Sequence, residues 1–232
     1  TAAAWTQTPS ITVTPSLTST ATFTSSPTVT QTLTITSTPT ITATPTITLS
    51  PTYDFPDVVV KELAHCRYGP AKAYLHAAVL EPGDKGTVRG RFKYSNWLQV
   101  KFDKINYFCW VSPSVVDVTG DISLIYYTEP KLEKVGSNMY GPPQDVYATR
   151  DGNMVTISWN QVVMTLDDDR GYFIEAWVCQ EGVYKWWVFS YPDQYTTSYT
   201  VQDDPGCSAP SRGEIRTVEK HGYSDPVPIP WP

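Results

Sequence analysis

The chain has 232 residues and a formal net charge of −6 at pH 7. Because nucleic-acid binding needs a basic stripe, this acidic balance argues against DNA or RNA as a partner. The sequence has no apolar run of about 18 residues that would predict a membrane-spanning helix. All 17 basic and 23 acidic residues follow Tyr53, so an uncharged segment precedes sequence of ordinary globular composition.

Residues 1–56 are predicted to form an extended arm rich in Thr, Ser and Pro. From Thr6 to Thr52 every even-numbered residue is Ser or Thr, whereas the odd positions carry Ile, Val, Leu, Phe and Pro with a few small or polar residues. Three interpretations compete: a glycosylated mucin-like stalk, a polyproline II spacer and a β-like extended strand. Only the strand explains strict alternation, because side chains of a strand alternate between two faces.

The two faces of this arm predict two kinds of contact. Its hydroxyl face offers candidate O-glycosylation sites: Thr12, Thr14, Thr28, Thr30, Thr34, Thr36, Thr40, Thr42, Thr46 and Thr48. Its apolar face favours docking, so residues 6–52 are expected to contact other protein subunits of a surface assembly. Sugars on one face and protein contacts on the other are compatible, and a glycosylated stalk without a fixed fold stays an alternative.

Four cysteines follow the arm, two in each half of the charged region. They have no CxxC spacing, and the one histidine beside them, His65 before Cys66, does not complete a zinc-ligand spacing, which argues against zinc. The expected disulfides are therefore Cys66–Cys109 and Cys179–Cys207. Structural disulfides indicate an oxidising compartment, and hence an extracellular, cell-surface location. Four free thiols in a cytosolic protein are the alternative.

Residues 57–120 contain short β-like runs such as "GTVRGRF" and "WLQVKF" between Gly, Pro and Asp turns, which predicts a small all-β barrel. This unit resembles a bacterial SH3 (SH3b) domain through Arg67, Gly69, Pro70, Tyr74, Gly83, Val88, Gly90, Trp97, Val100, Trp110 and Val111. It departs from the family at His65, usually Asn, and at Cys109, usually Gly. The resemblance implies a spacer or cell-wall-binding role, with a possible aromatic groove formed by Tyr68, Tyr74, Tyr94 and Trp97.

Residues 121–140 are predicted to be a short, partly ordered linker in which "ISLIYY" adds an edge strand. Residues 141–232 contain about seven short strands with turn signals between them, which favours a β-sandwich. This unit resembles a fibronectin type III domain through Pro142, Pro143, the run Val155–Trp159, Tyr172, the "TTSYTV" strand and Gly222–Ser224. The resemblance implies that Trp159 and Tyr172 lie in the core. The family's tyrosine on the penultimate strand is missing, with Ser211 near that place.

Three features of these units suggest a site and have a simpler explanation. Asp167–Asp169 lack the alternating ligand pattern of a calcium loop and are expected to be a solvated connection. Trp186 and Trp187, like Tyr94 and Trp97, are candidate binding residues; because adjacent strand residues face opposite sides, one of the two tryptophans is expected to be core and the other exposed. The three histidines have no nucleophile arrangement near them.

We therefore expect an all-β, non-enzymatic protein with no catalytic residue, no metal site and no cofactor. The predicted function is that of a secreted bacterial surface protein, a subunit or decoration of an extracellular filament or envelope layer, attached through its arm. The alternative is a carbohydrate- or peptidoglycan-binding module on a glycosylated stalk, with cell-wall glycan as its partner. A third reading, the targeting part of a hydrolase, is weakened because "PVPIPWP" resembles a natural C-terminus.

Overall fold

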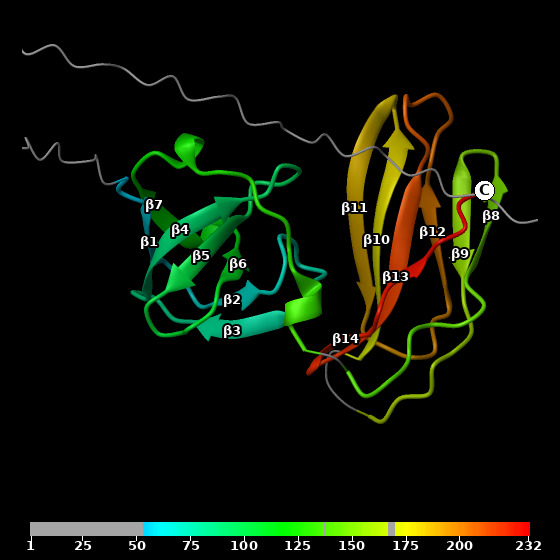
Figure 1. Ribbon diagram of the computed structural model, residues 1–232, viewed down its shortest axis with the longest axis horizontal. Coiled ribbons are helices and arrows are strands. Elements are labelled where there is room, and N and C mark those ends of the chain that lie inside the picture. The colour runs from blue at the N-terminus through cyan, green and yellow to red at the C-terminus, as the bar shows by residue number, and fades with distance from the viewer. Residues whose placement is uncertain (1–52, 137, 167–169) are drawn as a thin grey trace, which may run out of the picture. The chain divides into compact units, whose positions relative to one another are not determined.

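The computed structural model describes residues 53–136, 138–166 and 170–232, and within them the fold is all-β, as the sequence predicts. These described residues form one compact unit. Its strands, shown in Figure 1, are β1 (Asp57–Val60), β2 (Ala64–Arg67), β3 (His76–Leu80), β4 (Lys85–Arg91), β5 (Leu98–Phe102), β6 (Cys109–Val111), β7 (Val116–Thr119), β8 (Tyr147–Asp151), β9 (Met154–Ser158), β10 (Gly171–Gln180), β11 (Val183–Tyr191), β12 (Ser198–Gln202), β13 (Arg212–Glu219), β14 (Gly222–Tyr223) and β15 (Val227–Pro228). The predictions for the arm between residues 1 and 52 lie outside the described residues.

The first seven strands form a single antiparallel sheet, the curled sheet, in the order β3-β2-β6-β5-β4-β1-β7. Strand β5 shows that one face of this sheet is buried. Its residues Leu98, Val100 and Phe102 are buried, whereas the residues between them are partly exposed. Leu80 of β3 and Val116 of β7 belong to the same core although their strands stand at opposite ends of the order. The sheet must therefore wrap around one core. Its resemblance to an SH3b domain stays a prediction.

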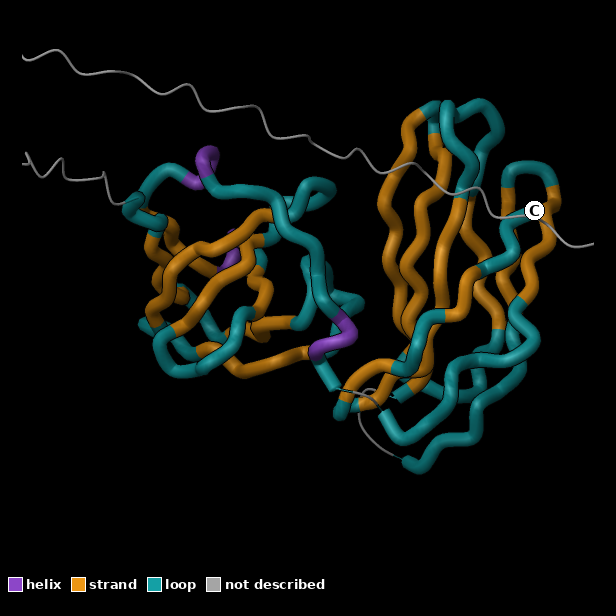
Figure 2. The backbone as a smooth tube through the Cα atoms, in the orientation of Figure 1, coloured by secondary structure: helices purple, strands orange, loops and turns teal. Residues whose placement is uncertain are grey.

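The linker after β7 does not add the predicted edge strand. Its residues form two 3-10 turns, η2 (Ile122–Leu124) and η3 (Leu132–Lys134), which Figure 2 draws among loops. Tyr127 makes only an isolated bridge to Arg91. The physical reason is the Arg91 side chain, which donates hydrogen bonds to the carbonyls of Ile125 (3.0 Å) and Ser123 (2.8 Å). Those carbonyls are then not available for a regular strand ladder.

The last eight strands form a sandwich of two antiparallel sheets, β12-β9-β8 and β11-β10-β13-β14, with β15 also paired to β13. Thus the first, second and fifth strands of this part share one sheet, and the third, fourth and sixth share the other. This is a fibronectin type III-like arrangement. The longest hairpin, β10–β11, turns through Glu181 and Gly182 at φ values of 55° and 75°, a pair of positive angles that suits the twist of two-residue hairpins.

The sandwich core lies between its two sheets. Val155 and Ile157 of β9 face Ile174 of β10 and Ile215 of β13 in one buried cluster. Trp159 and Tyr172 are both buried, which confirms the prediction from the sequence. The Tyr172 hydroxyl accepts a hydrogen bond from the Val162 amide at 2.9 Å and donates one to the Gln194 carbonyl at 3.1 Å.

Candidate functional site

An aromatic cluster joins the curled sheet to the sandwich. Its buried members come from both parts of the chain and from η3 between them: Tyr74, Leu75, Leu132, Phe173, Val218 and Tyr223. Strand β10 explains how the sandwich contributes. Tyr172 and Ile174 point into the sandwich core, so Phe173 between them points to the opposite face, where the curled sheet covers it. We call this set the interface cluster.

The rings of the interface cluster and its neighbours meet at close, tilted or edge-to-face geometry. The centroids of Tyr74 and Phe173 are 4.8 Å apart, and those of Phe92 and Trp186 are 4.6 Å apart. Aromatic pairs of this kind contribute about 0.5–1.5 kcal/mol each beyond the area they bury. Gly69 permits this packing, since a Cβ there would lie 2.3 Å from the Tyr74 ring. The two β parts are therefore fixed to one another by packed side chains.

Two hydrogen-bond systems complete this interface. The Leu75 amide donates to the Tyr223 hydroxyl at 2.8 Å. The Glu175 carboxylate accepts from the Trp186 indole N–H at 2.9 Å and from the Tyr74 hydroxyl at 3.3 Å. Burial raises the pKa of Glu175, and hydrogen bonds from Trp186 and Tyr74 offset only part of that effect. The interface thus holds a carboxyl group that is easier to protonate than usual.

The four candidate binding aromatics do not form one surface. Trp186 and Trp187 are both partly buried, so the expectation that one of them is exposed is wrong. Trp186 packs against the interface cluster, whereas Trp187 packs against the sandwich core and donates to the Tyr199 hydroxyl at 2.6 Å. The Tyr94 ring meets the edge of Trp177 at 4.3 Å. Trp97 is partly buried. The Trp186 ring already stacks on Tyr74, with 6.3 Å between centroids, and meets Phe92, with 4.6 Å between centroids.

A different group of aromatic side chains lines an open cavity of about 490 Å³, which we call the aromatic cleft. The aromatic members are Tyr68, Tyr107, Phe108, Trp110 and Tyr126. The other described side chains along it include Gln99, Thr128, Lys131 and Lys134. Of the predicted groove residues only Tyr68 belongs to it, because Tyr74 is buried in the interface cluster. The cleft therefore combines aromatic rings, neutral hydrogen-bonding groups and two cations.

The walls of the aromatic cleft are held by the curled sheet. The Tyr68 and Tyr107 rings stack at 6.4 Å with an angle of 29° between their planes, and the Tyr107 hydroxyl donates to the Ala77 carbonyl at 2.8 Å. Burial, with a smaller contribution from Tyr107, raises the pKa of the Tyr68 hydroxyl, which stays protonated at neutral pH. Trp110 on β6 is only 2% exposed and forms the floor.

The opposite wall comes from the linker. The Arg91 amide donates to the Tyr126 carbonyl at 3.1 Å and the Thr128 amide donates to the Arg91 carbonyl at 2.8 Å. Lys131 precedes the following η3 turn, Lys134 is its last residue, and both are exposed. Sequence reasoning missed this wall because residues 121–140 were treated as a connection. The signal was the density of aromatic and lysine residues in "LIYYTEPKLEK", unusual for a segment that only connects.

A second cavity, of about 470 Å³, lies along the outer face of β10 and β13. Several of its charged groups pair within the chain: Arg216 lies 2.7 Å from the Glu214 carboxylate, and the Arg212 guanidinium lies 5.8 Å from the Trp177 ring centroid. The cavity is also lined by Glu129 and Glu133. It is a weaker candidate for ligand binding than the aromatic cleft.

The structure forms the disulfides Cys66–Cys109 and Cys179–Cys207, the pairing expected from the sequence. They close 43 and 28 residues, which corresponds to roughly 4 and 3.6 kcal/mol in the chain-entropy account. Each disulfide links segments of one β part. The Cys66–Cys109 disulfide lies in the core of the curled sheet, and Cys179 of the second disulfide lies near the end of β10 in the sandwich. The curled sheet and the sandwich are thus stabilised separately.

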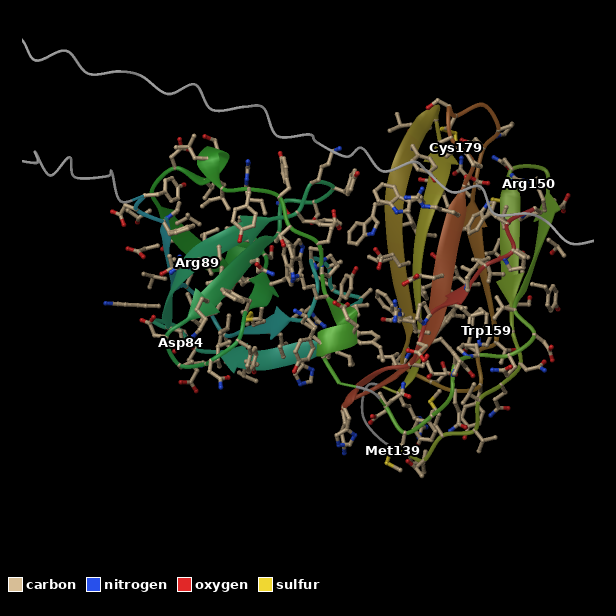
Figure 3. All side chains as sticks on the ribbon, viewed as in Figure 1. Asp84, Arg89, Met139, Arg150, Trp159 and Cys179 are labelled. Atoms are coloured by element: carbon tan, nitrogen blue, oxygen red, sulfur yellow. A yellow bond between two sulfur atoms is a disulfide. The ribbon has the colours of Figure 1, made fainter. Side chains whose placement is uncertain are left out.

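A buried carboxylate, that of Asp203, lies beside Ser211. Asp203 is 1% exposed and accepts hydrogen bonds from the Ser211 hydroxyl, the Trp231 indole and the Cys179 amide. The side chains of Arg150 and Cys179, labelled in Figure 3, come from different sheets, and both residues bond this carboxylate. Burial raises the pKa of Asp203, but these hydrogen bonds outweigh it and lower the pKa overall.

Some of the remaining predicted features cannot be placed, and the others form no metal cluster within the described residues. Asp167–Asp169 and the ten candidate threonines lie outside the described residues. Within the described residues no three His, Cys, Asp or Glu side chains gather as a metal site. The His65 and His76 rings lie 5.2 Å apart, and His221 contacts the Glu219 carboxylate at 2.8 Å. The same part of the chain contains no helix whose length and hydropathy suit a membrane span.

Comparison with known proteins gives a limited result. No protein-family model and no curated protein matches the chain. One solved structure that it is similar to is described as "Crystal structure of chicken CNTN1 FN1-FN3 domains", at 16% sequence identity and a TM-score of 0.27. The match covers 75% of this chain, which spans about half (52%) of that one. The fibronectin type III-like character of the sandwich therefore rests on its own strand order.

Proposed function

We propose that this chain is a non-enzymatic, secreted bacterial surface protein, a subunit or decoration of an extracellular filament or envelope layer. One observation carries the proposal: two disulfide-stapled β parts are locked together by the interface cluster into one compact unit. This compact unit, which we call the head, is suited to display on a cell surface. It keeps its fold in an oxidising environment, where no reducing system or chaperone protects it.

The arm is the proposed means of attachment. Residues 6–52 combine a hydroxyl at every even position with large aliphatic residues at many odd positions. A merely solvated spacer does not need the aliphatic residues, whereas a segment that pairs or docks through one face does. Sugars on the threonines would protect the other face. The partners are then other protein subunits of the same assembly.

The test compares three secreted forms of the protein: the full chain, a form lacking residues 1–52, and a form whose arm keeps its composition but has its order scrambled. Light scattering, electron microscopy and cell-surface fractionation measure assembly and attachment. We expect that only the full chain assembles or attaches. The head is expected to give the same near-ultraviolet circular dichroism in all three forms. Equal attachment by the truncated or scrambled form would refute the proposal. Intact mass reports whether the arm carries sugar.

A further inference from the structure

The aromatic cleft has no assigned role in surface assembly, yet it exposes side chains that a folded protein usually covers. Tyr126 is 62% exposed and Phe108 is 53% exposed. The two lie on different segments, the linker and the turn before β6, and converge on the same cavity. Gathered exposed aromatic rings with a few polar groups are typical of a binding site.

The charge of the aromatic cleft is opposite to that of the chain. Its charged lining residues are Lys131 and Lys134, whereas the whole chain carries a net charge of −6. Both ammonium groups are exposed, so they attract an anion without having lost their hydration. Among the described lining residues no carboxylate neutralises them. A negatively charged ligand therefore complements this part of the surface.

The rest of the lining narrows the chemistry. Exposed aromatic faces such as those of Tyr126 and Phe108 suit the apolar face of a sugar ring, and the Gln99 amide and Thr128 hydroxyl suit sugar hydroxyls. A cavity of about 490 Å³ that opens to solvent accommodates one or two residues of a longer polymer. We propose that the aromatic cleft binds an acidic polysaccharide, with a uronic acid ring against the aromatic side chains and its carboxylate at Lys131 and Lys134.

The test uses the full chain and calorimetric titration with a matched pair of probes. One is a short oligomer of galacturonic acid, and the other is the same oligomer with its carboxyl groups reduced to alcohols. We expect the acidic oligomer to bind about 2- to 30-fold more tightly, which is the factor that two exposed ion pairs supply. Its affinity is expected to fall as salt rises from about 0.05 to 0.5 M, because screening shortens the reach of exposed charges.

Three variants locate the site. The double variant Lys131→Gln/Lys134→Gln is expected to weaken binding of the acidic oligomer by the same factor, about 2- to 30-fold, and to leave binding of the reduced oligomer unchanged. Tyr126→Ala is expected to weaken both oligomers, because it removes a stacking surface. Lys61→Gln, at an exposed lysine paired with Asp117, is the matched control and is expected to bind as the wild type does. Near-ultraviolet circular dichroism checks that each variant is folded, and Phe108→Ala replaces Tyr126→Ala if the latter is not.

Several results would overturn this proposal. If both oligomers bind with equal affinity, the lysines do not recognise the carboxylates. If neither oligomer binds, the aromatic cleft is not a site for this ligand. Binding of an oligoglutamate peptide as tightly as the acidic oligomer shows that charge alone is recognised and not a sugar. Wild-type affinity in the two lysine-to-glutamine substitutions places the ligand elsewhere. Because titration needs no assembly, these results are independent of what the arm does.

Discussion

Phe173→Ala is the sharpest test of the interface cluster. The side chain is 1% exposed and contacts Tyr74 of the curled sheet at 4.8 Å and Tyr223 at 5.4 Å between ring centroids. It lies on the outer face of β10, so its removal leaves the sandwich core intact. Truncating a buried phenylalanine costs about 3–5 kcal/mol. We expect a loss in the lower half of that range, since the covering side chains can partly close the gap.

Differential scanning calorimetry measures the effect. The wild type is expected to unfold in one transition, because the cluster couples both β parts. The variant is expected to separate into two transitions, with a first midpoint roughly 6–15 °C lower at about 2–4 °C per kcal/mol. Tyr195→Ala, at a tyrosine 66% exposed, is the matched control and should stay within about 0.5 kcal/mol of wild type. A single transition in Phe173→Ala, less than 1 kcal/mol from wild type, would refute the reasoning.

Three further predictions use urea unfolding. Burial raises the folded-state pKa of Glu175 above its ordinary 4.5. The wild type should therefore lose stability as pH rises through that folded pKa, whereas Glu175→Gln should not. Parallel curves of stability against pH for the two proteins would contradict this. Asp203 has a lowered pKa. Asp203→Asn should therefore lower the free energy of unfolding by about 2 kcal/mol at pH 7, and by progressively less as pH falls below the ordinary value of 3.8. A difference that stays constant with pH would show that the carboxylate charge is irrelevant. Gly69→Ala should lower the free energy of unfolding by about 1–3 kcal/mol, because its Cβ would meet the Tyr74 ring. Gly141→Ala, whose Cβ would meet nothing within 4 Å, should be neutral. Equal effects of the two substitutions would exclude the steric explanation.

The all-β fold and its two disulfides could be predicted because they depend on local patterns. Alternating residues in β5 and β9 reveal which face is buried without knowledge of the partner sheet. The burial of Trp159 and Tyr172 followed from a resemblance of the sandwich to a family with the same strand order. The cysteine pairing followed from position alone, since two cysteines fell in each half of the charged region.

The interface and the cleft were missed because they depend on contacts between distant segments. Period-two reasoning treats one face of a strand as solvated, yet β10 carries apolar residues on both: Ile174 inward and Phe173 outward. A strand apolar on both faces is typical of one covered on both sides. Without that step, Trp186 and Trp187 on the neighbouring strand were both candidate binding residues, and one of them was expected to be exposed. The aromatic cleft needs the linker to fold back onto β4, which no local pattern of Tyr126 indicates.

Strand β1 has a mechanical consequence for a protein displayed through its N-terminal segment. It follows directly after that segment and pairs with β4 on one side and β7 on the other. Tension along β1 would load the hydrogen bonds of both ladders simultaneously, in shear, and they would have to break together. Had the chain entered at an edge strand, the same pull would load only one ladder. The point of entry thus favours resistance to force, whatever the head holds.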